Sequence, residues 1–178
     1  DRDSAWGTDP RAVAARVVDA VAHHGRSLDA AIAAFAPDPF ATQLAFQTVR
    51  FHRGLDAALR PLLRRPPKGR QRLLHALLLC GARELSEARR PAFAVVNETV
   101  SAASALGFRP ARGFVNAVLR HLAAAPPDPD ALTGTASHPP WLVNALGDSW
   151  GERAEAIARA NDRPGPMTLR VNALRSDR

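Results

Sequence analysis

Apolar residues recur every three or four positions through the first two thirds of the chain, which is the spacing of one face of an α-helix. Val13, Val17 and Val21 form the first such stripe, which follows Asp9-Pro10 and stops before Gly25. Proline suits the first helical position because the amide that it lacks would be unpaired there, and glycine suits the left-handed end of a helix. The pattern therefore predicts a first helix between Pro10 and Gly25.

Six further helices follow from the same spacing before residue 125. They are a short helix capped by Ser27, a helix over 40–54, one from Leu55 that ends before Pro66, and helices over about 69–87, 93–106 and 111–124. The helix over 69–87 is apolar almost all round, which is typical of the central, enclosed member of a bundle. No stretch of this region alternates with the two-residue period of a strand. The sequence therefore predicts an all-α domain over residues 9–124.

The composition changes at residue 125, where the stretch Ala-Pro-Pro-Asp-Pro-Asp begins. Closely spaced prolines are typical of a connection between domains, so residues 125–136 are predicted to be a linker. Residues 137–178 form a second region, with one short helix near His138, another over 152–160 and a strand over 167–171. Because a lone strand is not stable, we expect this region to be the incomplete start of a further domain.

Composition narrows the possible partners. The chain has 24 Lys and Arg against 17 Asp and Glu, a formal net charge of +7 and a pI of about 11.3, a balance that favours a polyanion. A single cysteine, Cys80, excludes an internal disulfide and a cluster of cysteine metal ligands. No apolar run approaches the roughly 18 residues that a membrane helix needs. We therefore expect a cytoplasmic protein that does not contact membranes.

Basic residues gather in two segments that contain no carboxylate. Every charged residue between Asp56 and Glu84 is basic: Arg60, Arg64, Arg65, Lys68, Arg70, Arg72 and Arg83. The second segment, residues 99–127, contains Arg109, Arg112 and Arg120. Arginine suits phosphate because its planar guanidinium donates two hydrogen bonds at once, and the free amides at two helix starts add donors. The predicted RNA-binding residues are Arg64, Arg65, Lys68, Arg70, Arg72, Arg109 and Arg112.

A solvated surface of an arginine-rich protein would show similar runs of charge, and this alternative interpretation stays open. The position of both runs beside helix starts favours a site for a polyanion. Aromatic residues do not interleave these arginines, and the chain has no tyrosine. The pattern therefore argues against a stacking platform for single strands and favours phosphate contacts with folded RNA.

Polar residues inside the apolar runs have a structural interpretation. Asn97, Glu98 and Asn116 are predicted to tie the ends of neighbouring helices together, since a buried amide or carboxylate needs hydrogen-bond partners. Cys80 is predicted to pack in the core with a poorly reactive thiol. The histidines lack metal-ligand spacing, and no glycine-rich loop follows a strand. The sequence thus predicts no catalytic residue, no cofactor site and no metal site in this chain.

Several motifs together resemble a known family. Residues from about 11 to 122 are similar to the NusB-like helical domain, found in the antitermination factor NusB and at the front of the RsmB (Sun/Fmu) rRNA methyltransferases. The motifs are Lys68-Gly-Arg-Gln-Arg, Val96-Asn-Glu-Thr-Val and Gly113-Phe-Val-Asn-Ala-Val-Leu-Arg. His138-Pro-Pro-Trp-Leu and Pro166-Met-Thr-Leu-Arg-Val-Asn resemble the entry to the methyltransferase, which free NusB lacks. One departure is Cys80-Gly-Ala-Arg-Glu-Leu, where the family often has Gly-Leu-Tyr-Gln-Leu-Leu.

The resemblance implies the RNA-binding front part of an enzyme that methylates carbon 5 of a cytosine in 16S rRNA. It implies S-adenosylmethionine as the cofactor of the whole enzyme, bound outside this chain. It also implies two partners, small-subunit rRNA and the protein's own catalytic domain. Two alternatives stay open, a protein-interaction module and a free transcription antitermination factor.

Overall fold

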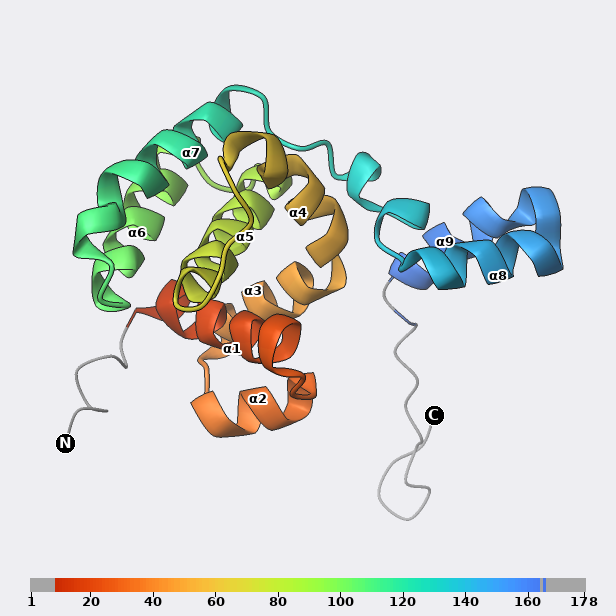
Figure 1. The fold of residues 1–178 in the computed structure, drawn as a ribbon, viewed down its shortest axis with the longest axis horizontal. Coiled ribbons are helices and arrows are strands. Elements are labelled where there is room, and N and C mark those ends of the chain that lie inside the picture. Colours follow the sequence, from red (N-terminus) through yellow and green to blue (C-terminus); the bar gives the residue numbers. More distant parts are fainter. Residues whose placement is uncertain (1–8, 164, 166–178) are drawn as a thin grey trace, which may run out of the picture.

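The computed structural model describes residues 9–163 and 165, and this part of the chain contains helices and no strand. Seven α-helices form a bundle, and two more extend from one side of it (Figure 1). The helices of the bundle are α1 (Pro10–His24), α2 (Leu28–Phe35), α3 (Pro39–Arg50), α4 (His52–Leu59), α5 (Gln71–Glu87), α6 (Ala92–Ala105) and α7 (Arg112–Ala124). The remaining two are α8 (Pro140–Trp150) and α9 (Ala154–Asp162). The predicted all-α fold is confirmed for the described residues.

Local capping explains where the first helices begin and end. The carboxylate of Asp9 accepts hydrogen bonds from the amides of Arg11 and Ala12, at 2.9 and 3.2 Å, and so satisfies two donors that have no partner within the helix. Gly25 ends α1 in the left-handed conformation, with φ at 67°. The hydroxyl of Ser27 caps α2 by accepting from the amide of Ala30 at 3.2 Å. All three boundary residues were predicted from the sequence.

Helix α5 is the centre of the bundle. Every residue from Leu74 to Ser86 is buried, and α1, α3, α4, α6 and α7 all pack against this helix. Figure 1 shows α5 enclosed by these neighbours. An apolar helix without a polar face is stable only in such a position, so the prediction of an enclosed central helix is confirmed.

The boundary between α3 and α4 differs from the prediction. The sequence interpretation ended a helix at Gly54, but α3 ends at Arg50 and Gly54 lies inside α4. A β-carbon at Gly54 would lie 2.9 Å from Cδ2 of Leu132 and 3.2 Å from its Cα. The glycine therefore permits a close approach of residue 132 and does not end a helix.

That contact anchors the predicted linker to the bundle. Leu132, in the 3-10 turn η3 (Asp130–Leu132), is 3% exposed and belongs to the hydrophobic core. A second turn, η4 (Gly134–Ala136), packs against α9, where the carboxylate of Asp162 accepts hydrogen bonds from the Gly134 amide and the Ser137 hydroxyl at 2.7 and 2.8 Å. Residues 125–136 thus connect the bundle to α8 and α9 through packed side chains.

Two helices predicted after residue 136 are present as α8 and α9. No side chain of α8 is buried, and its two tryptophans, Trp141 and Trp150, are 70% and 55% exposed. The strand predicted over 167–171 lies outside the described residues. Among the helices that the structure describes, none is long and apolar enough to cross a membrane.

Candidate nucleic-acid interface

The seven predicted RNA-binding residues come from two connections of the bundle. Five of them lie on the loop that joins α4 to α5 or on the first turn of α5, and Arg109 and Arg112 lie between α6 and α7. All seven side chains are exposed. In Figure 1 the first of these loops leaves α4 and passes in front of α5 in this view.

Arg70 joins the two segments. Its guanidinium donates a long hydrogen bond of 3.5 Å to the carbonyl oxygen of Gly107, and it lies over the ring of Phe108, 5.0 Å from the ring centroid. A guanidinium in this position is attracted by the negative face of the ring. Because Arg109 follows directly in the chain, the two arginine segments meet at this point.

A groove lies between the loop that precedes α5 and helix α7. Its cavity volume is about 800 Å³, within the range of about 300–1,000 Å³ that is typical of ligand sites. One wall comes from the loop before α5 and includes Arg64 and Arg65, and the opposite wall comes from α7 and includes Phe114. Side chains of α5 complete the lining, among them Leu74 and His75. None of the lining residues is a carboxylate.

The basic residues of the first segment divide into paired and unpaired groups. Arg60 donates to Asp56 at 3.0 Å, and Arg83 is buried, where it donates to Glu87 at 2.8 Å and contacts the ring of Phe51. The Arg83 side chain is therefore not available to a polyanion, whereas Arg60 is 77% exposed and is held only by a surface pair. Within the part of the chain that the structure describes, no hydrogen bond or ion pair engages the side chains of Arg64, Arg65, Lys68, Arg72, Arg109 and Arg112.

Arg72 brings positive charge close to α1. It is on the first turn of α5, close enough to His23 of α1 for its charge to act on that imidazole. Burial is the main cause that lowers the pKa of His23, and the positive charge of Arg72 adds to the effect. The seven exposed basic residues are called the arginine surface below. This surface extends from the α6–α7 connection across the start of α5 to the end of α1.

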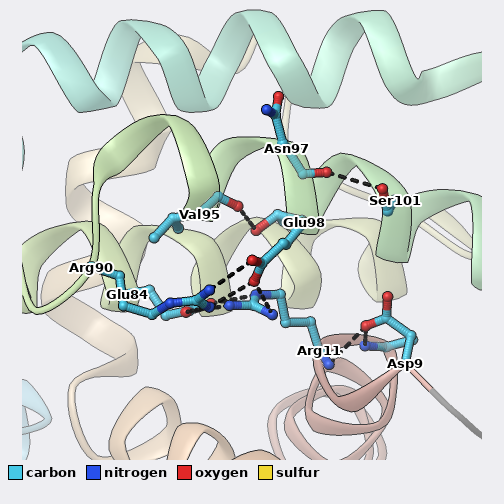
Figure 2. Close-up of polar contacts among 10 residues, drawn as sticks. Asp9, Arg11, Glu84, Arg90, Val95, Asn97, Glu98 and Ser101 are labelled. Carbon is cyan, nitrogen blue, oxygen red and sulfur yellow. Dashed lines mark hydrogen bonds and ion pairs between the residues drawn. The ribbon is translucent and has the colours of Figure 1, made fainter.

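Buried carboxylates are held in a separate network. Arg11 of α1 donates two hydrogen bonds to Glu84 of α5, at 2.7 and 2.6 Å, and forms an ion pair of 2.8 Å with Glu98 of α6. Arg90 donates two further bonds of 2.6 Å to Glu98. Figure 2 shows these four side chains converging between the three helices. Residue Glu98 therefore ties helices together, as its place in an apolar run predicted.

The pKa values of the two carboxyl groups in this network are shifted by burial and by pairing with arginine. Burial raises the pKa of Glu84, and the hydrogen bonds from Arg11 oppose that rise. The hydrogen bonds from Arg90 lower the pKa of Glu98, which is more exposed. The role of Arg11 could not be predicted from the sequence, because its partners lie 73 and 87 positions further along the chain. Arg11 is therefore a structural residue. The two carboxylates that it pairs with, Glu84 and Glu98, do not line the groove beside the arginine surface.

The prediction for Asn97 is wrong. Asn97 is exposed, its side chain points away from the ion-pair network, and only its carbonyl takes part, by accepting from Ser101 (Figure 2). Its side chain lines a shallow groove between α6 and α7 together with Asn116, which is half-buried. Apolar neighbours in the sequence placed Asn97 in the core, but the helical turn directs it outward.

Three histidines meet between α1, α4 and α5. The ring of His23 lies 6.5 Å from that of His52 and 6.2 Å from that of His75, centroid to centroid. Burial lowers the pKa of all three imidazoles, and the carboxylate of Asp56 opposes the shift at His52 and His75. No group of side chains suited to a metal ion occurs among the described residues.

Cys80 is a core residue, as predicted. It is fully buried, and burial raises the pKa of its thiol to about 12. A thiol that stays protonated is a poor nucleophile. Cys80 therefore packs and does not react.

The fold and surface define a NusB-type helical bundle with an exposed arginine surface. Residues 8–124, more than half of the chain, match the model of the NusB family. The chain belongs to the NusB family. Residues 138–178 match a second model, described as the Methyltr_RsmF/B-like ferredoxin-like domain.

Curated relatives align with almost the whole of this chain. The chain is 35% identical to ribosomal RNA small subunit methyltransferase B of Vibrio vulnificus over 179 residues, covering 94% of this chain and 42% of the relative. It is 38% identical to the protein of the same name from Xanthomonas campestris, covering 97% and 40%. For the Pseudomonas putida protein the identity is 39%, with 92% and 40% covered. The chain thus spans about two fifths of the length of these relatives, and its resemblance to the RsmB methyltransferases is confirmed.

Proposed function

We propose that this chain binds small-subunit ribosomal RNA in the cytoplasm through the exposed residues Arg64, Arg65, Lys68, Arg70, Arg72, Arg109 and Arg112. The proposed role is to hold the RNA for the catalytic part of a methyltransferase. One observation carries the proposal: two arginine segments, separated by more than thirty positions, meet through Arg70 and Phe108 on a surface whose groove has no carboxylate.

The phosphates of an RNA backbone bind arginine side chains that have no carboxylate partner. Each phosphate contact releases condensed counterions, so the affinity falls linearly with the logarithm of salt concentration. Burial in an internal ion pair would prevent this, as it does for Arg83. Arg64 and Arg65, which lie on the groove wall, are therefore the side chains whose removal should weaken binding most directly.

The test measures binding of the chain to a small-subunit rRNA fragment over a series of salt concentrations. The double variant Arg64→Ala/Arg65→Ala should bind more weakly, and its salt slope should be shallower by about one for each contact removed. Both substitutions are at exposed positions, so circular dichroism should show an unchanged fold.

A matched control removes two exposed arginines elsewhere. Arg153→Ala/Arg163→Ala changes the net charge by the same amount near α9, away from the arginine surface. Equal weakening by the two double variants would reduce the effect to net charge and contradict a defined interface. An affinity of the unaltered chain that does not change with salt would reject phosphate contact altogether.

For the whole protein we propose methyl transfer from S-adenosylmethionine to carbon 5 of a cytosine in 16S rRNA. The names of the relatives and the match of residues 138–178 support this proposal. The groove does not fit the cofactor, since it has no carboxylate to accept hydrogen bonds from the ribose hydroxyls. Cys80, buried and protonated, does not fit the role of a nucleophile. We therefore assign neither catalysis nor cofactor binding to the described residues.

A protein-interaction role is the second candidate, and α8 favours it. This helix buries no side chain and exposes Trp141 and Trp150, which suits contact with the remainder of a methyltransferase. If the bundle serves mainly for packing, the Arg64→Ala/Arg65→Ala variant will keep its RNA affinity. The match of residues 138–178 favours both candidates over a free antitermination factor.

A further inference from the structure

The groove between the loop before α5 and helix α7 has a chemistry that the arginines alone do not explain. We propose that it takes one unstacked base of the bound RNA, with the ring of Phe114 as the stacking surface. This inference rests on the proposed RNA-binding function and adds the kind of RNA that the surface selects: a stem with a bulged or flipped base, in place of a fully paired stem.

The lining is suited to a flat, largely apolar group. It consists mostly of aliphatic side chains, among them Leu62, Leu74 and Leu78, and its cavity volume of about 800 Å³ is ample for a base. Phe114 stands on the α7 wall and is 43% exposed, although it is a large apolar residue. Such a ring offers the face on which bases of any sequence can stack.

A polar group without a partner also lines the groove. His75 is 3% exposed, and neither of its ring nitrogens has a partner that meets the geometry of a hydrogen bond among the described residues. Its Nε2 lies 3.1 Å from a carboxylate oxygen of Asp56, so a neutral imidazole with its proton on Nε2 leaves Nδ1 as an acceptor. Buried polar atoms normally have partners, and an exocyclic amino group of a base would supply one once the side chains that cover Nδ1 move aside.

Positive charge at the rim matches the phosphates that flank a base. Arg64 and Arg65 line the groove on the wall formed by the loop before α5, and Arg112 directly follows the lining residue Ala111. An apolar peptide segment would gain nothing from this rim, whereas a nucleotide presents an apolar base and a charged backbone together. Charge complementarity thus favours a nucleotide as the occupant.

The sequence argued against stacking because no aromatic residue interleaves the arginines. The fold supplies the missing ring from a different helix, since Phe114 lies about fifty positions after Arg64. Single-base recognition is therefore compatible with contacts to an otherwise folded RNA.

The experiment compares two RNA hairpins with identical stems, one fully paired and one with a single bulged 2-aminopurine. The chain should bind the bulged hairpin at least about fivefold more tightly, the lower end of what a base–aromatic stack contributes. The bulged fluorophore should also change its emission on binding. Phe114→Ala should remove both the preference and the emission change, while Phe114→Trp should keep them.

Two further variants make the result specific. Phe93→Ala removes a phenylalanine that is 72% exposed on α6 and outside the groove, and it should keep the preference. Phe114→Leu keeps an apolar side chain without a π face and should lose the preference, which covers the case in which Phe114→Ala disturbs the fold. Circular dichroism checks each variant.

The outcomes distinguish binding of a base in the groove from binding of phosphates by the arginine surface. Equal, salt-dependent affinities for the two hairpins would overturn the pocket, assign the groove to a protein segment and leave phosphate binding intact. Equal weakening of both hairpins by Phe114→Ala would also overturn it. Binding that is independent of salt would reject the proposed function itself.

Discussion

His75 shows how burial changes the chemistry of a single residue. It lies at 3% exposure beside His23, close to His52, and near the carboxylate of Asp56, which partly offsets the effect of burial on its pKa. The net shift is downward, so the folded chain holds His75 neutral at pH values at which an unfolded chain would take up a proton. The neighbouring histidines shift in the same direction.

Stability should therefore fall when the pH drops below about 6.5, the ordinary pKa of histidine. In that range the unfolded state binds more protons than the folded state, so protonation favours unfolding, and stability is regained as the pH rises. Urea unfolding between pH 8 and pH 5 measures the change. In the variant His75→Gln, whose amide cannot take up a proton, the free energy of unfolding should depend less steeply on pH. An identical pH dependence in this variant would show that His75 is not responsible.

At the scale of elements, the ion-pair network fixes how α1 and α6 meet α5. Arg11 and Glu84 are each 7% exposed as side chains and form a two-pronged pair, whereas Arg90 and Glu98 are about 40% exposed. A buried pair is costly to break, because the remaining charge has no water around it. An exposed pair of similar geometry contributes little, because solvent screens it.

Arg11→Ala should lower the free energy of unfolding by about 3–5 kcal/mol, since it leaves the buried Glu84 with only Arg90, 3.8 Å away, as a neighbouring cation. Arg90→Ala, at the exposed end of the same network, should cost less than about 1 kcal/mol. Chemical denaturation of both variants measures the difference. Similar costs for the two substitutions would contradict the assignment of Arg11 as the residue that holds these helices together.

At the scale of the whole molecule, the bundle meets the segment that carries α8 and α9 through the packing of Leu132 on α4 and through a hydrogen bond of 3.0 Å from the guanidinium of Arg50 to the carbonyl oxygen of Asp162. Leu132 reaches α4 at Gly54, where any larger residue would meet it at close range. The position of this segment thus depends in part on the packing of Leu132 against Gly54, at residues that do not belong to the arginine surface. Any RNA that contacts the bundle and reaches a catalytic domain beyond α9 would depend on this geometry.

Gly54→Val should destabilise the chain by about 1–3 kcal/mol through overpacking against Leu132. In the double variant with Leu132→Ala the two costs should not add, because the smaller side chain makes room for the valine. Gly147→Val is the matched control, since no atom outside its own helix lies within 4 Å of a β-carbon at this position of α8. Thermal unfolding of the single and double variants provides a double-mutant cycle for this contact. Additive losses of stability would refute the contact between Gly54 and Leu132.

Much of the fold could be predicted because its signals are local. The caps at Asp9 and Ser27, the stop at Gly25 and the apolar run of α5 each act within a few positions of the residue concerned. The candidate interface was partly predictable for the same reason, since runs of unpaired arginines are visible along the chain. Which of those arginines are free was not visible, because the pairing of Arg83 with Glu87 depends on helical geometry and burial.

The amino-acid sequence by itself determined the helices, the enclosed position of α5 and the excess of positive charge in two segments, since periodicity, capping and composition are properties of neighbouring residues. Only the tertiary structure decided that Arg11 meets Glu84, that Leu132 meets Gly54 and that Phe114 faces Arg64 across a groove. Each of these contacts joins positions that lie about fifty or more residues apart. Packing of whole helices, and no local preference, brings such positions together.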